Sequence, residues 1–251
     1  MKITSIKTHK ITTSDTDIRT ILRMYLPKLN ERSIVAVTSK IVAICEGRTV
    51  KVDGADKDKL VEHEAEYFLP KDENKWGFHL TITNGIIIAS SGIDESNGNG
   101  RYILWPKNPQ KSANMIREFL VSEYNLQEVG VVITDSRISP LRRGVTGVAI
   151  AHSGFLALKD YIGRPDIFGH NLKVTKANIA DALATASVVM MGEGREQTPI
   201  GVITELPFVK FQRRNPAKKE LADLQIPLDE DIFASILKRA PWKKGKSSGN
   251  G

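Results

Sequence analysis

The sequence predicts a mixed α/β fold rather than a doubly wound parallel sheet, because strand-like and helical segments alternate irregularly along the chain. Of the 251 residues, 41% are apolar and 26% are charged, a balance typical of globular proteins. The dipeptide Asn84-Gly85 separates two strand-like runs, which is a strong signal for a β-hairpin. The length fits one large α/β domain or two small ones.

Strands are expected where short apolar or alternating runs are bounded by turn residues. Residues 34–37 are a continuous apolar run, typical of a buried strand. In chain order, the expected strands are residues 2–11, 34–37, 79–83, 86–90, 130–134, 145–151 and 200–204.

Helices are expected where apolar residues recur with helical spacing between start and stop signals. Asp15 and Asp17 supply acidic and capping residues ahead of the first such segment. Gly47 would end a short helix that opens near Ile41, and Gly192 follows an alanine-rich helix. In chain order, the expected helices are residues 18–26, 41–46, 57–67, 109–125 and 178–191.

We expect residues 1–206 to form the main domain, with a candidate sub-domain boundary near residues 70–78, and residues 207–251 to form a basic extension. The extension holds ten Lys or Arg and five Asp or Glu, so +5 of the net charge of +7 lies there. The remaining +2 disfavours nucleic acid as the partner of the main domain. A solubilising tail and an RNA-contacting tail both remain open, and residues 242–251 are expected to be disordered.

Several classes of protein are excluded or disfavoured. Cys45 is the only cysteine, which excludes an internal disulfide and a cysteine-cluster metal site. No apolar run approaches the roughly 18 residues that a membrane helix needs. The first residues lack the apolar core of a secretory signal. We therefore expect a cytoplasmic enzyme or binding protein that contacts no membrane.

Three acidic residues lie where a predicted element gives way to a turn: Asp94, Asp135 and Glu193. Functional groups of α/β proteins gather at such positions. Carboxylate oxygens are ligands that Mg²⁺ and Mn²⁺ prefer, and Ser136 and Asn97 would add neutral oxygens. The alternative is ordinary turn chemistry, because Asp, Asn, Ser and Gly are also the common turn residues.

Two basic features accompany these acids. Arg142 and Arg143 follow Asp135, and paired guanidinium groups suit the charge neutralisation of phosphoryl transfer. Ser39 and Lys40 follow the buried strand 34–37, where a polar turn and a lysine at a helix start form a plausible phosphate cradle. An exposed arginine pair and a capped helix start are the alternatives. The chain has no P-loop motif, so any phosphate site is of another kind.

At these positions the sequence resembles the gamma-glutamyl ligase family that extends the glutamate tail of the deazaflavin coenzyme F420. The resemblance covers about residues 34–206. Its order and spacing of segments are specific, although no single segment would be. The segments are residues 39–42 (SKIV), 46–48 (EGR), 92–97 (GIDESN), 133–136 (ITDS), 144 and 147–150 (GVAI), 163–169 (GRPDIFG) and 191–194 (MGEG).

The resemblance implies a mixed α/β fold peculiar to the family, a homodimer, and dependence on GTP, or else ATP, with Mn²⁺ or Mg²⁺ at a two-metal site. It implies that the nucleotide activates a carboxylate as an acyl phosphate, which the amine of L-glutamate then attacks. By this resemblance Asp94 and Asp135 hold metal, with Ser136 and Glu193 at a second metal. It assigns nucleotide contacts to seven residues: Ser39, Lys40, Asn97, Met191, Gly192, Gly194 and Thr198.

The chain also departs from the family pattern. Members acting on the deazaflavin usually carry Phe-Gly-Arg-Pro-Trp-Arg after the Asp-Ser or Asp-Thr pair, whereas residues 137–142 here read RISPLR. Ile44 replaces a usual lysine, and an N-terminal Gly-Ile-Pro is missing. We therefore expect Asp94, Asp135 and Arg142 to act in catalysis on a pterin- or folate-like acceptor or on the deazaflavin itself. The alternative is an inactive homologue that binds the nucleotide or the cofactor.

Overall fold

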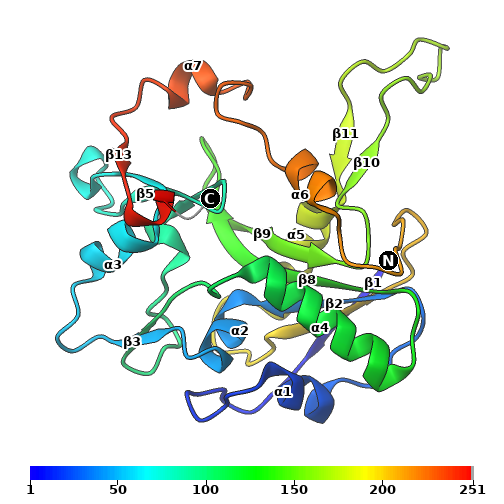
Figure 1. The fold of residues 1–251 in the computed structure, drawn as a ribbon, viewed down its shortest axis with the longest axis horizontal. Helices are drawn as coiled ribbons and strands as arrows, with labels where there is room; N and C mark the ends of the chain where they lie inside the picture. Colours follow the sequence, from blue (N-terminus) through cyan, green and yellow to red (C-terminus); the bar gives the residue numbers. More distant parts are fainter. Residues whose placement is uncertain (250–251) are drawn as a thin grey trace.

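The computed structural model describes residues 1–249, and its centre is a five-stranded sheet of order β1-β12-β2-β8-β9 (Figure 1). Its strands are β1 (Lys2–Ile6), β2 (Ser33–Thr38), β8 (Val129–Ile138), β9 (Val145–Ser153) and β12 (Ile200–Thr204). β2 and β8 run parallel, whereas the other neighbours are antiparallel. The predicted mixed α/β class is therefore confirmed.

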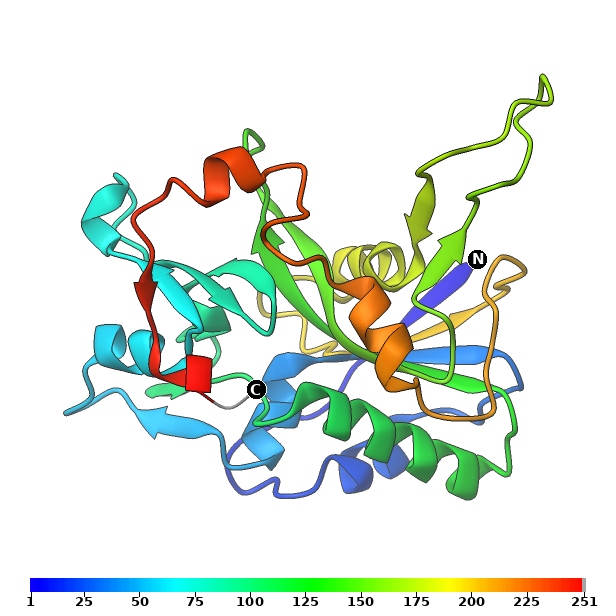
Figure 2. The ribbon, with the colours of Figure 1, turned by 45° about the horizontal axis from the view of Figure 1, so that its top comes forward.

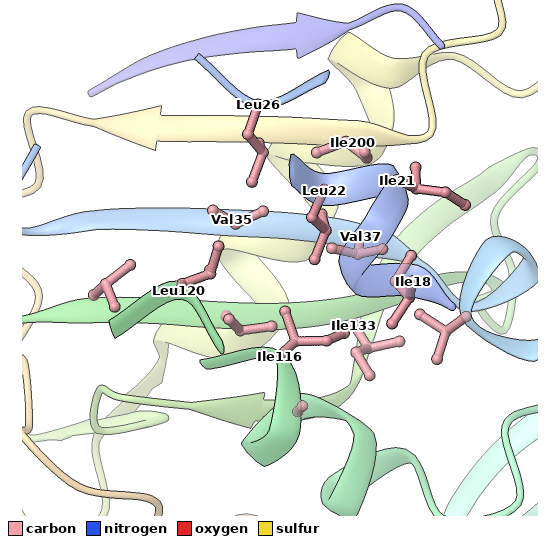
Figure 3. Close-up of a cluster of buried hydrophobic side chains, with 14 of the residues drawn as sticks. Ile18, Ile21, Leu22, Leu26, Val35, Val37, Ile116, Leu120, Ile133 and Ile200 are labelled. Atoms are coloured by element: carbon pink, nitrogen blue, oxygen red, sulfur yellow. The ribbon is translucent and has the colours of Figure 1, made fainter. Parts of the chain in front are cut away.

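Helices cover both faces of this sheet (Figure 2). They are α1 (Ile18–Tyr25), α2 (Ser39–Cys45) and α4 (Pro109–Tyr124) on one face, and α5 (Ile179–Met191) on the other. Val35 and Val37 of β2 pack into the first core, which Figure 3 shows, and Ile34 and Ala36 pack against α5. Because successive side chains point to opposite faces, a strand covered on both sides is apolar throughout.

A second sheet of four strands lies beside the first, in the order β13-β4-β5-β6. Its elements are β4 (Tyr67–Leu69), β5 (Leu80–Thr83), β6 (Ile86–Ala89) and β13 (Lys243–Lys244), with α3 (Lys57–Glu64) and η1 (Lys71–Glu73) nearby in sequence. Asn84 and Gly85 form the expected hairpin turn, both with positive φ, at 49° and 67°. A short ladder joins β3 (Thr49–Lys51) to β7 (Arg101–Ile103), and η2 (Ser90–Gly92) follows β6.

Two further features project from the core (Figure 2). β10 (Leu158–Asp160) and β11 (Lys176–Asn178) form the base of a long arm. The segment after β12 contains α6 (Lys218–Leu224), α7 (Ala234–Leu237), β13 and η3 (Lys246–Gly249). The expectation of a disordered end covered residues 242–251; within it Lys243–Lys244 pair with β4, and residues 250–251 lie outside the described residues.

Three element boundaries were predicted wrongly. The first strand ends at Ile6, because its partner β12 pairs with it only as far as Ile200. The helix expected over 57–67 ends at Glu64, since Tyr67–Leu69 pair with β5. The strand expected over 130–134 continues to Ile138, because β9 supplies hydrogen-bonding partners beyond a bulge at Ile133/Thr134. The missed strands β3, β4, β7, β10 and β11 have three residues each and β13 has two, too few for a periodic signal.

Among the described residues, no helix combines the length and the apolar character that crossing a bilayer requires.

Candidate functional site

Four separate segments of the chain bring their polar side chains together at the edge of the central sheet. Lys40 of α2 places its Nζ 3.1 Å from Asp94 Oδ2, in the loop after η2, and donates to Ser96 Oγ at 3.1 Å. On β8, Ser136 Oγ lies 3.5 Å from Oε2 of Glu193, which follows α5. These contacts join residues that are 56 and 57 positions apart in the sequence.

Local backbone geometry fixes the position of Asp94. Its N–H and carbonyl both bond to Ile103, at 3.0 and 2.7 Å, so the loop is held against the end of β7. Gly92, two residues earlier, has φ of 69°. A Cβ there would lie 2.1 Å from Nε1 of Trp105. Only glycine therefore allows the indole to pass this loop.

The indole of Trp105 reaches Asp135 and donates a hydrogen bond from Nε1 to Oδ2. The backbone N–H of Ser136 donates to Oδ1 at 2.8 Å. Burial, and next the negative charge of Asp94, raise the pKa of Asp135 to about 7, against the lowering effects of these hydrogen bonds and of Lys40. Two hydrogen-bond donors therefore hold Asp135 in a site where burial and the charge of Asp94 disfavour its ionised form.

Glu193 owes its position to the end of α5. The helix ends at Met191, Gly192 follows with φ of 80°, and the chain turns so that Glu193 points toward β8. Burial raises the pKa of Glu193, and the charge of Asp94 raises it further, although Lys40 opposes both. The two carboxyl groups with raised pKa values, Asp135 and Glu193, thus share one charge partner in Lys40.

The turn after α5 is itself braced. Thr198 Oγ1 donates to the carbonyl of Met191 at 2.5 Å, and the N–H of Gly194 donates to Glu196 Oε2 at 2.8 Å. Asn97 Nδ2 donates to the carbonyl of Gly194 at 3.1 Å. The loop that carries Asp94 and the turn that carries Glu193 are therefore joined directly.

The donor chemistry fits a divalent cation. Asp94, Asp135, Glu193 and Ser136 offer hard oxygens only, as Mg²⁺ and Mn²⁺ require. A cation between them would offset the burial and like-charge effects that raise the pKa of Asp135. Within residues 1–249, however, no group of three or more His, Cys, Asp or Glu side chains is placed so that it could hold a metal ion. The ammonium group of Lys40 instead lies against the carboxylate of Asp94, so binding a cation there requires Lys40 to move.

The structure thus brings together most of the residues that the sequence singled out. Ser39 is buried at the first position of α2, next to Lys40. Arg142 is the exception: it lies exposed in the turn between β8 and β9, and its side chain has no hydrogen-bond or ion-pair partner in the described part of the chain.

Two details of the site were missed from the sequence. Asp135 lies within β8 rather than after it, for the reason given above. Trp105 was not singled out, and no sequence signal marks it, because its contact with Asp135 depends on the close approach to Gly92.

Comparisons with known proteins identify the family to which the chain is similar. The model of the family described as F420-0:Gamma-glutamyl ligase matches residues 5–205. The chain is 36% identical over 217 residues to the coenzyme F420:L-glutamate ligase of Methanocaldococcus jannaschii, with 77% of this chain and 84% of that protein covered. It is 31% identical to the enzyme of the same name from Methanopyrus kandleri, with 82% and 87% covered, and 44% identical to that of Methanococcus maripaludis strain C7, with 62% and 60% covered.

Proposed function

The chain belongs to the F420-0:gamma-glutamyl ligase family, whose enzymes form amide bonds, and we propose that it joins L-glutamate to a carboxylate of a deazaflavin acceptor of the F420-0 type. The observation that carries the proposal is the meeting of Lys40, Asp94, Asp135 and Glu193 from four segments that all lie inside the matched region. A cluster of oxygen ligands beside a lysine suits the binding of a nucleoside triphosphate together with its metal ion.

In this proposal Asp94, Asp135, Ser136 and Glu193 would hold Mg²⁺ or Mn²⁺, which would neutralise phosphate charge when bound. Trp105 and the N–H of Ser136 orient the carboxylate of Asp135. Lys40 forms an ion pair with Asp94. When a metal ion takes the place of the ammonium group beside Asp94, Lys40 would be available to bind a phosphate oxygen. Ser39, Asn97 and the turn formed by residues 191–198 line the place of the nucleotide.

The proposed reaction has two steps. The acceptor carboxylate attacks the γ-phosphorus of GTP or ATP, which releases the nucleoside diphosphate and forms an acyl phosphate. The amine of L-glutamate then attacks the acyl carbon; inorganic phosphate leaves and the amine loses one proton. Each product molecule therefore accompanies one nucleoside diphosphate and one phosphate.

The decisive experiment is a ligation assay read by mass spectrometry. Purified protein is incubated with L-glutamate, Mn²⁺ or Mg²⁺, GTP or ATP, and F420-0, with pteroate and folate as further acceptors. A product from F420-0 that is heavier by one glutamyl unit, with equal release of phosphate, supports the proposal. Product from pteroate or folate alone would identify a pterin-type acceptor, the alternative suggested by the departure of residues 137–142 from the family pattern. Nucleotide binding without product on any of these would favour the inactive homologue.

The proposal includes a homodimer, supported by the arm between β10 and β11 (Figure 2). Ile167, Phe168 and Val174 on this arm are 91%, 79% and 84% exposed, an unusual density of apolar side chains in water. Sedimentation of the protein and of the Ile167→Ser/Phe168→Ser variant tests this. A dimer that dissociates in the variant is expected, and a monomeric protein would contradict it.

A further inference from the structure

The segment that follows the matched region crosses the molecule as a strap, residues 207–249, that is fixed at both ends. At its start Glu220 pairs with Arg214 at 2.7 Å and accepts a hydrogen bond from Gln212 at 2.7 Å. The N–H of Gln212 donates to the carbonyl of Gly154, next to β9, at 2.8 Å. This end is thus tied to the central sheet.

The other end joins the second sheet. Lys243 and Lys244 pair with β4, and the N–H groups of Gly245 and Ser247 donate to Glu66 and Ala65 at 2.9 and 3.2 Å. An additional contact, from Gln225 Nε2 to the carbonyl of Asn84 at 3.1 Å, reaches the β5–β6 turn. No hydrogen bond or ion pair joins residues 226–242 to any other described part of the chain.

This middle part bounds a cavity of about 1640 Å³. Phe233 and Ile236 of the strap line it, although they are 56% and 67% exposed. Ile87 of β6 and Ile138 and Leu141 of the β8–β9 hairpin line it as well. Ligand sites of 300–1,000 Å³ accommodate drug-sized molecules, so this space suits an extended ligand with an apolar part.

The cavity adjoins the acidic cluster. Arg137, two residues after Asp135 on β8, lines it. Arg48 lines it too, and its Nε donates at 3.0 Å to the carbonyl of Trp105, the residue whose indole holds Asp135. Trp105 thus contacts both a residue of the cavity lining and a carboxylate of the acidic cluster.

Charged side chains of both signs line the cavity, four basic and four acidic. Arg48 and Arg137 are paired with Glu64 and Asp181. Lys107 and Lys246 also line the cavity, as do Glu66 and Asp231, and none of these four has an ion-pair partner within residues 1–249. The apolar side chains suit an aromatic ring system, and Lys107 and Lys246 can each pair with a negatively charged group of the same ligand.

We propose that the strap is part of the acceptor-binding site, with Phe233 and Ile236 as the outer apolar wall against the ring system of the acceptor. This rests on the proposed ligase function and adds to it a binding surface outside residues 5–205.

Steady-state kinetics with F420-0 test the inference. The Phe233→Ala/Ile236→Ala variant should raise KM for F420-0 by about tenfold or more, with KM for L-glutamate and nucleotide unchanged. Ile232→Ala is the matched control, because Ile232 lies on the same segment, is 87% exposed and does not line the cavity. An acceptor KM in the double variant within twofold of the control would overturn the inference.

A second variant changes only the end of the strap that is attached to the second sheet. A Cβ on Gly245 would lie 2.0 Å from the carbonyl oxygen of Ala65, so Gly245→Ala should displace the end of the strap and raise the same KM. If the wild type ligates nothing, the proposed function fails, and equilibrium dialysis of F420-0 without nucleotide still tests the strap. Equal binding by wild type and double variant, or none by either, would overturn it. A changed sedimentation coefficient with unchanged acceptor affinity would assign the surface to a second copy of the chain.

Discussion

The indole Nε1 of Trp105 donates a hydrogen bond to the carboxylate of Asp135, although the two residues lie 30 positions apart. The bond exists because Gly92 leaves room for the indole at the loop that carries Asp94. One tryptophan therefore orients the carboxylate of Asp135, whose pKa the negative charge of Asp94 helps to raise.

Trp105→Phe should weaken Mn²⁺ binding by about 10–100-fold, because the ring is kept while the donor that orients Asp135 is lost. Isothermal titration calorimetry with Mn²⁺ alone measures this without turnover. Trp76→Phe, at a tryptophan that is 73% exposed, is the control. Equal Mn²⁺ affinity in both variants would contradict a role of Trp105 in orienting a metal ligand.

Asp135→Asn should abolish ligation and phosphate release while the fold is retained. Burial and the charge of Asp94 raise the pKa of Asp135, so the ionised carboxylate destabilises the folded state. The neutral amide removes that effect, and the unfolding midpoint in urea should not fall. Asp53→Asn, at an exposed position, should leave both activity and midpoint unchanged. Residual turnover in Asp135→Asn would remove Asp135 from the catalytic set.

Gly92→Ala should destabilise the fold by more than the strain of placing an alanine at a positive φ. Gly163 has a similar φ of 79° but open space around its Cβ position, so Gly163→Ala isolates the conformational cost of about 1 kcal/mol. At Gly92 the clash with Trp105 should add about 1–3 kcal/mol. Urea unfolding of the two variants gives the difference, and equal losses would mean that the indole moves aside freely.

His152 should make the protein less stable in mild acid. Burial lowers its pKa to about 4, whereas the unfolded imidazole titrates near 6.5. Between these values the unfolded chain binds the extra proton, so the free energy of unfolding falls as pH drops from about 6.5 to about 4, by up to about 3 kcal/mol. His152→Gln should show a correspondingly flatter profile in chemical unfolding across that window. Identical slopes would show that other groups dominate.

The sequence alone predicted much of the fold where the signal was local. The Asn84-Gly85 turn, the α4 helix opened by Pro109 and the apolar β2 were all expected with boundaries within one or two residues. Local rules suffice there because a turn dipeptide, a capping residue or an apolar run acts within a few positions. The three-residue strands were missed because their stability comes from partners distant in the sequence.

For the site, the sequence determined which chemistry is available: oxygen ligands at Asp94, Asp135 and Glu193, a lysine at position 40, and a family resemblance that the comparisons bear out. Tertiary structure alone decided how these groups act on one another. The indole over Gly92, the ion pair of Lys40 with Asp94, and the continuation of β8 through Asp135 all depend on chain segments that meet only in the folded state. Burial and distance between charges set a pKa, and neither quantity is encoded at a single position of the chain.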